Sequence, residues 1–189
     1  MDYMHELKIP KERIAVLIGT KGETKKELEE ETHSKIDVDS AEGIVRIEGN
    51  DSIQLYEAKE LVKAIARGFN PEVARLLLRS DYALALINIE EFTGGSQKSL
   101  NRLRGRVIGQ EGKSRKTIEQ DTETYVCVYG KTVGIIGESQ NVDIARIAVE
   151  NLLKGSTHTS VFKWLEKKRK FSMLGNKINK SDIKEEFLE

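Results

Sequence analysis

The stretch RVIGQEGKSRK, residues 106–116, contains two glycines three residues apart, followed by a cluster of cations. Glycine adopts a positive φ without a steric penalty and leaves room for the backbone of a ligand to come close. A helix that begins after Gly112 would point its first amide groups and the positive end of its dipole at the turn, which suits a phosphate. The spacing therefore predicts a tight turn that packs against its neighbours, binds phosphate, or does both.

A second copy of this stretch lies 90 residues earlier in the chain. LIGTKGETKKELEEETHSKIDV (17–38) aligns with VIGQEGKSRKTIEQDTETYVCV (107–128) without a gap. The identical pairs are Ile18/Ile108, Gly19/Gly109, Gly22/Gly112, Lys26/Lys116, Glu29/Glu119 and Thr32/Thr122. With small changes of offset, VRIEG (45–49) aligns with VGIIG (133–137), and the helical patterns that follow also align. An isolated Gly-x-x-Gly is weak evidence for a site, whereas a repeat of the whole unit indicates two copies of one small domain.

The charge of the chain is distributed unevenly between these copies, although its net charge is zero. Residues 98–116 carry seven cations and one acid, whereas residues 11–26 carry five cations and two acids and are followed by four more acids in 27–31. A polyanion would be attracted to the cationic segment. We therefore expect the second copy to be the stronger binder. The alternative is that the cations form an ordinary solvated helix face, and this alternative has more weight for the first copy than for the second.

Periodicity predicts the same elements in each copy. In the first, a strand (5–9) precedes a helix from Pro10 to Ile18, the glycine turn, a second helix, strands near 35–38 and 44–47, and a helix over 53–66. The second copy repeats this order with a strand at 82–92 and helices over 98–108 and 142–153. The predicted class is α+β, with the order β-α-α-β-β-α. The expected division is 1–69 first domain, 70–80 linker helix, 81–157 second domain, 158–171 C-terminal helix and 172–189 flexible tail.

These residues carry a resemblance to a known module. Ile-Gly-Thr-Lys-Gly and Ile-Gly-Gln-Glu-Gly resemble the Ile-Gly-x-x-Gly signature of KH domains, and two strands and a helix after the turn resemble the type I topology. The resemblance implies that the glycine turn clamps the backbone of about four nucleotides of single-stranded nucleic acid.

Two tandem modules and the extension LLKGSTHTSVFKWLEKKR are similar to the archaeal members of the Partner-of-Nob-One (Dim-two) family. This resemblance implies binding near the 3′ end of small-subunit (16S) ribosomal RNA during ribosome biogenesis. It also implies two protein partners, a Nob-type endonuclease and the alpha subunit of translation initiation factor two. Eukaryotic relatives have a degenerate first module, whereas Gly19 and Gly22 are intact here.

The candidate RNA-binding residues follow from the two turns, the cations around them and the apolar residues beside them. In the second module they are Arg102, Arg106, Ile108, Gly109, Gln110, Glu111, Gly112, Lys113, Arg115, Lys116 and Val126. In the first they are Ile18, Gly19, Thr20, Lys21, Gly22 and Lys25. Ile18, Ile108 and Val126 could equally be core residues, and Tyr125 and Tyr129 could stack on bases or pack against a neighbouring surface.

The sequence argues against catalysis. GKS at 112–114 resembles the end of a P-loop, but that motif needs a glycine where Val107 stands. No His, Cys or acid spacing suggests a metal site, so we expect no enzyme activity, metal or cofactor. The start lacks a signal-peptide pattern and no apolar run could span a bilayer, which predicts a cytoplasmic protein without membrane contact. The alternative functions are a general RNA-binding adaptor in decay or transcription, and a mainly protein-binding scaffold.

Overall fold

The computed structural model describes residues 3–170, and the expected flexible tail (172–189) lies outside the described residues. The first module consists of β1 (Tyr3–Lys8), α1 (Lys11–Ile18), α2 (Glu23–Thr32), β2 (Lys35–Asp39), β3 (Ile44–Gly49) and α3 (Ser52–Ala66). Its antiparallel sheet has the order β1-β3-β2. Alternation along β3 sends Val45 and Ile47 into the core, and the Asp51 side chain caps α3 by accepting from the Ile53 and Gln54 amides.

The second module repeats this arrangement. It consists of β4 (Tyr82–Asn88), α5 (Gln97–Ile108), α6 (Lys113–Thr122), β5 (Tyr125–Tyr129), β6 (Thr132–Glu138) and α7 (Ser139–Lys154), with sheet order β4-β6-β5. The predicted α+β class and the β-α-α-β-β-α order are confirmed. The strand expected over 82–92 is shorter, because the Asn88 side chain accepts from the Glu90 amide and turns the chain into a short 3-10 helix, η3 (Ile89–Phe92).

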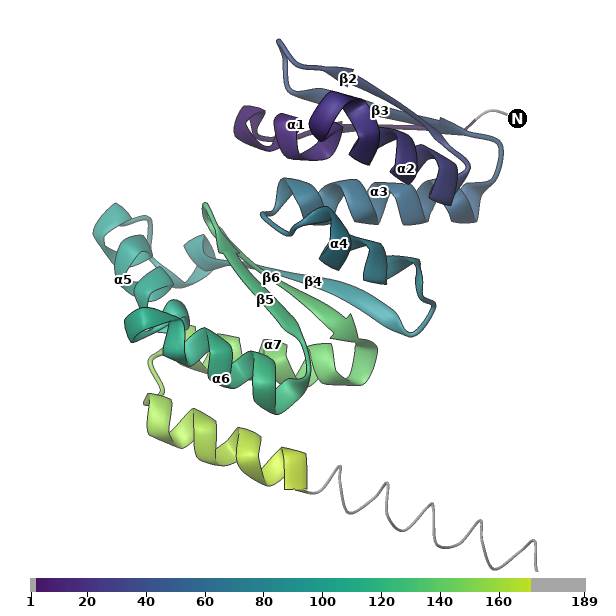
Figure 1. Cartoon of the computed structure of the whole chain (residues 1–189). Coiled ribbons are helices and arrows are strands. Elements are labelled where there is room, and N and C mark those ends of the chain that lie inside the picture. The colour runs from purple at the N-terminus through teal and green to yellow at the C-terminus, as the bar shows by residue number, and fades with distance from the viewer. Residues whose placement is uncertain (1–2, 171–189) are drawn as a thin grey trace, which may run out of the picture.

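The two modules stack in the same orientation (Figure 1). The helices of the first module lie between its own sheet and the sheet of the second, whose helices lie on the far side. The segment between the modules contains α4 (Pro71–Ala74) and the 3-10 helix η2 (Arg75–Leu78) rather than one continuous helix. Ile136 of β6 belongs to the core of the first module, and Leu84 packs against it. The second sheet is therefore covered on both faces.

The sequences of the two central strands, β3 and β6, differ in the way expected if only the second sheet is covered on both faces. In VRIEG of β3, Arg46 and Glu48 lie on the outer face, where Arg46 pairs with Glu6 at 3.1 Å and with Asp37 at 3.9 Å. In VGIIG of β6, the aligned residues are Gly134 and Ile136. A methyl group at Gly134 would lie 2.6 Å from the Phe69 ring, so the first module packs directly against this backbone.

A helix over residues 158–170 packs below the second module (Figure 1). Val161 and Leu165 bury its inner face in the core of the second module. None of the helices within residues 3–170 is long and apolar enough to cross a membrane.

Candidate nucleic-acid interface

The two glycine turns have the same backbone geometry. In the second module φ is +74° at Gly109, +53° at Glu111 and +75° at Gly112. In the first module the values are +73° at Gly19, +52° at Lys21 and +82° at Gly22. Each turn contains a short 3-10 segment, Thr20–Gly22 or Gln110–Gly112, and its two central side chains are exposed. The sequence repeat thus corresponds to one repeated turn.

The two glycines of a turn have different roles. A methyl group at Gly109 would lie 2.6 Å from both the backbone nitrogen and the Cβ of Ser114, and one at Gly19 would lie 2.9 Å from the Thr24 nitrogen. The first glycine is therefore required for packing. At Gly22 and Gly112 an added methyl group would meet nothing within 4 Å. The second glycine combines a positive φ with open space in front of it, which is where a ligand backbone can approach.

Two lysines of α6 lie at the open side of the second turn. Lys113 and Lys116 are exposed on α6, and neither pairs with an acid within the described residues. Lys113 is the first residue of α6, where the helix dipole disfavours a cation, whereas α2 begins with the favoured Glu23. An open hollow of about 570 Å³ adjoins the turn. Its lining comprises Gln110, Glu111, Lys113, Lys116, Thr117 and Gln120.

The two predicted arginines of α5 differ in their surroundings. Arg102 is exposed and has its Nη2 3.4 Å from the Ser99 hydroxyl. Arg106 instead donates from Nε to the Leu152 carbonyl at 3.0 Å and from Nη2 to the Ser156 carbonyl at 2.6 Å. The spacing of four residues predicts that Arg102 and Arg106 share one face of the helix. The guanidinium of Arg106 instead caps the end of α7, so the two side chains do not form one exposed pair. Arg13 does the same in the first module, with Ile65 and Phe69 as acceptors.

A carboxylate not singled out as a site residue links each second helix to its neighbouring strand. Glu119 accepts from the Val126 amide at 2.8 Å, and Glu29 accepts from the Ile36 amide at 2.7 Å. Arg115 lies over the same strand, with Nη1 3.4 Å from the Val126 carbonyl and Nε 3.8 Å from Glu119. The signal for these acids was present, because they are one of the identical pairs of the repeat.

The lysines of α2 are more fully paired than the cations of α6, because Lys25 makes the ion pair equivalent to Arg115–Glu119 and Lys26 is also paired. Lys25 lies 3.4 Å from Glu29, and the next lysine, Lys26, lies 3.8 Å from Glu30. In addition, Arg75 of η2 forms ion pairs with Glu27 and Glu31 of α2. The hydrogen bond to Glu27 raises the pKa of Arg75. The acidic run of α2 therefore holds the inter-module segment.

The apolar candidates differ in burial. Val126 is 2 % exposed and belongs to the core of its module. Ile18 and Ile108 are half-buried at the ends of α1 and α5, next to the turns. Tyr129 contacts the first module, with its hydroxyl 2.5 Å from the Glu12 carboxylate and its ring 5.9 Å from the Arg13 guanidinium, whereas Tyr125 is 45 % exposed. Packing between modules is thus the observed role of Tyr129.

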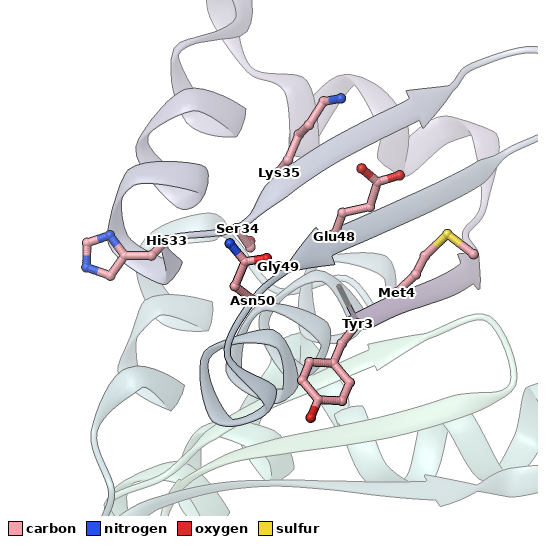
Figure 2. Close-up of a pocket in the computed structure, with 8 residues that line it drawn as sticks. All are labelled: Tyr3, Met4, His33, Ser34, Lys35, Glu48, Gly49 and Asn50. Carbon is pink, nitrogen blue, oxygen red and sulfur yellow. The ribbon is translucent and has the colours of Figure 1, made fainter. Parts of the chain in front are cut away.

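A larger hollow of about 720 Å³ lies away from both turns (Figure 2). It opens at the end of α2 opposite the glycine turn, where His33 caps the helix. Lys35, Glu48 and Met4 extend along one side of it in Figure 2, and Tyr3 points away below them. None of the predicted RNA-binding residues lines it. No group of three His, Cys or acidic side chains within residues 3–170 could hold a metal ion.

Comparison with known families matches both modules. The KH domain matches residues 4–64, and the eukaryotic type KH domain (type I), in the form of the second KH domain of PNO1, matches residues 83–170. The latter range includes the helix over 158–170, so this helix is part of the matched unit.

Individual proteins resemble the chain over different lengths. A KH domain-containing protein of Methanocaldococcus jannaschii is 48% identical over 167 residues, covering 86% of this chain and 73% of the relative. The RNA-binding protein PNO1 of Oryzias latipes is 32% identical over 116 residues, covering 61% of this chain and 48% of the relative. The chain thus spans about half the length of this eukaryotic relative.

Solved structures extend the likeness to three dimensions. Dim2p of Pyrococcus horikoshii, in a complex with the initiation factor a/eIF2alpha and rRNA, is 44% identical with a TM-score of 0.83, covering 89% of this chain and 95% of the other. A protein of unknown function from Aeropyrum pernix is 34% identical with a TM-score of 0.89, covering 96% of this chain and 98% of the other.

Proposed function

The chain belongs to the PNO1/Dim2 family of tandem KH proteins, and from this premise we propose that it binds the 3′ end region of small-subunit (16S) ribosomal RNA as a single strand during ribosome biogenesis in the cytoplasm. The observation that carries the proposal is the open space at Gly112 beside Lys113 and Lys116, which have no acid partner within residues 3–170. A phosphate there meets exposed backbone and two cations without displacing any protein contact.

The mechanism is backbone clamping followed by base contact. The turn Gly109–Gly112 and the first amides of α6 hold the sugar–phosphate backbone, with Lys113 and Lys116 neutralising its charge. Bases then lie along the groove beside Ile108 and β5, where exposed edges supply the sequence preference. Arg102 and Arg115 flank that groove, and Gln110 and Glu111 lie at its tip. No step requires a metal or a cofactor.

The first module contributes a weaker site of the same kind. Gly22 is open in the same way as Gly112, and Thr20 and Lys21 are exposed at the tip of the turn. Lys26, at the position of Lys116, pairs with Glu30, and the acids of α2 reduce the local positive potential. RNA contacts through this module therefore add to binding that the second module initiates.

The protein partners in the proposal are the alpha subunit of initiation factor two and a Nob-type endonuclease. The first is supported by the rRNA complex of the Pyrococcus horikoshii relative. The surface of the first module also supports a protein contact, because Ile53 and Tyr56 lie one turn apart on α3 and are 69 % and 57 % exposed. Exposed apolar residues grouped in this way are typical of protein interfaces.

The proposal is tested by measuring RNA affinity of the Gly112→Asp and Gly22→Asp variants by fluorescence anisotropy. The RNAs are a 16S 3′-end fragment and a scrambled strand of equal composition. We expect Gly112→Asp to remove most of the affinity, Gly22→Asp to reduce it less, and the scrambled strand to bind more weakly. Gly109→Asp is unsuitable because it would clash with Ser114. Unchanged affinity of Gly112→Asp, with a native circular dichroism spectrum, would reject clamping by this turn.

A further inference from the structure

The C-terminal helix (158–170) is fixed to the second module beside its glycine turn. His158 Nε2 lies 2.8 Å from the carbonyl oxygen of Arg106, three residues before the turn Gly109–Gly112. Val161 and Leu165 are 4 % and 0 % exposed. Toward the other end, Arg169 Nη1 lies 3.3 Å from Asp121 in the last turn of α6. The helix thus runs along α6 from the turn to the far end of that helix.

The C-terminal helix has more cations than acidic partners within the described residues. Its five cations are Lys163, Lys167, Lys168, Arg169 and Lys170, against one acid, Glu166. Three of them have partners: Arg169 pairs with Asp121, Lys170 pairs with Glu166 at 2.8 Å, and Lys168 lies over the Trp164 ring at 5.8 Å.

Lys163 and Lys167 remain without an acid partner within residues 3–170, and both are exposed. They lie four residues apart on one side of the helix, where two like charges destabilise the helix. The helix dipole favours cations only in the last turn, so it does not account for Lys163. A pair of free lysines on a firmly docked helix is therefore a surface suited to an external anion.

The chemistry of this surface favours a polyanion over a protein. The large exposed apolar side chains within the described residues are Tyr3, Met4, Ile53, Tyr56, Tyr125 and Ile147, and none belongs to the C-terminal helix. A protein interface of standard kind would need an apolar centre. Phosphate groups need only cations and water.

We infer that Lys163 and Lys167 bind phosphates of the same RNA that the second module clamps, beyond the nucleotides held in its groove. This inference rests on the proposed function. A strand that leaves the groove over the exposed Lys113 and Lys116 crosses α6 and reaches the C-terminal helix on its other side. The helix is then a second, sequence-independent contact that lengthens the bound segment.

The test compares two RNAs and two double variants of the full chain. One RNA has about four nucleotides and fills only the groove, and the other extends the same sequence by about ten nucleotides at each end. Lys163→Gln/Lys167→Gln removes the proposed contacts. Lys8→Gln/Lys35→Gln removes the same charge from exposed positions on the first sheet. Affinity is measured by fluorescence anisotropy at several salt concentrations.

We expect the Lys163→Gln/Lys167→Gln variant to bind the long RNA several-fold more weakly, with a salt slope smaller by about 1.4, since each phosphate contact on a single strand contributes about 0.7. Its affinity for the short RNA should equal that of the wild type, and the control variant should match the wild type on both RNAs. Equal loss on the short and long RNAs, equal loss in the control variant, or no loss on the long RNA would each overturn the inference. Failure of the wild type to bind the short RNA would instead reject the proposed function.

Discussion

The two glycine turns share one backbone conformation but differ in what surrounds them. At the first position of the following helix, α2 has Glu23 and α6 has Lys113. Glu23 agrees with the helix dipole and stabilises α2, whereas Lys113 opposes the dipole of α6. Lys113 is unfavourable for the helix and lies next to open space. Such a residue is expected at a binding site, where an anionic ligand would interact with the lysine. The comparison supports the proposal that the second module is the stronger RNA clamp.

The two sheets also share one backbone arrangement but differ in their surroundings. Their inward residues are equivalent, while the outward residues of β3 are charged and those of β6 are glycine and isoleucine. The first sheet has a solvated outer face with an ion-paired ladder, and the second is buried beneath α3 and the linker segment. The two modules thus share one core arrangement, whereas the outer face of the first sheet is solvated and that of the second is covered by the first module.

The largest effect should come from exchanging the outward residues of the two central strands. Ile136→Glu would bury a carboxylate between the modules without a partner, which we expect to cost about 4 kcal/mol of unfolding free energy. The matched change Glu48→Ile lies on the exposed face of β3 and should alter stability by less than about 0.5 kcal/mol. Urea unfolding of both variants measures the difference. Similar costs for the two would contradict the covered and free faces described above.

A second test separates the two glycines of one turn. Gly109→Ala combines a positive φ with a clash against Ser114 and should cost about 3 kcal/mol, whereas Gly112→Ala carries only the backbone strain of about 1 kcal/mol. Thermal and urea unfolding report both values. The same order is expected for Gly19→Ala and Gly22→Ala in the first module. A larger loss for Gly112→Ala than for Gly109→Ala would show that the packing role is assigned to the wrong glycine.

Much of this fold could be predicted from the repeat, because alternating and helical periods survive in both copies and the glycine spacing marks the turn. The role of Arg106 could not be predicted from the sequence. Its spacing of four residues places it on the same helix face as Arg102, but its guanidinium donates to carbonyl groups that lie 46 and 50 residues later in the chain. Such contacts depend on tertiary packing. The stacking of the modules could have been predicted from the two central strands. VRIEG alternates apolar and charged residues, whereas VGIIG has no polar residue, which is typical of a strand buried on both faces. The early end of β4 depended on one Asn88 side-chain hydrogen bond, which periodicity does not detect.

A reciprocal charge exchange tests the ranking of the two RNA sites. Lys113→Glu gives the second module the residue of the first, and we expect RNA affinity to fall roughly 30-fold, from the loss of about 2 kcal/mol for one charge-assisted contact. Glu23→Lys gives the first module the residue of the second and should raise affinity a few-fold. Fluorescence anisotropy with the 16S 3′-end fragment measures both. Lys59→Glu on α3, distant from either turn in the chain, controls for net charge. A loss in that control equal to the loss in Lys113→Glu would mean that net charge, not position, governs binding.

The smallest effect concerns the contact that joins α1 of the first module to β5 of the second. The hydrogen bond from Tyr129 is the main cause of the lowered pKa of Glu12, whose ordinary value is 4.5. A carboxyl group with a lowered folded-state pKa stabilises the fold above its unfolded pKa, and this contribution is lost as the pH falls through the folded value. Tyr129→Phe should therefore lower the melting temperature slightly at pH 7, and the difference from the wild type should shrink below about pH 4.5.

Tyr125→Phe is the matched control for this contact, because Tyr125 lies on the same strand and its hydroxyl has no hydrogen-bond partner among the described residues. It should leave the melting temperature unchanged at both pH values. If Tyr129→Phe had the same effect at pH 7 and at pH 3, the tyrosine would stabilise the junction by packing alone. The Glu12 carboxylate would then contribute nothing to the coupling of the two modules, and their fixed stacking would depend on the apolar contacts around Ile136.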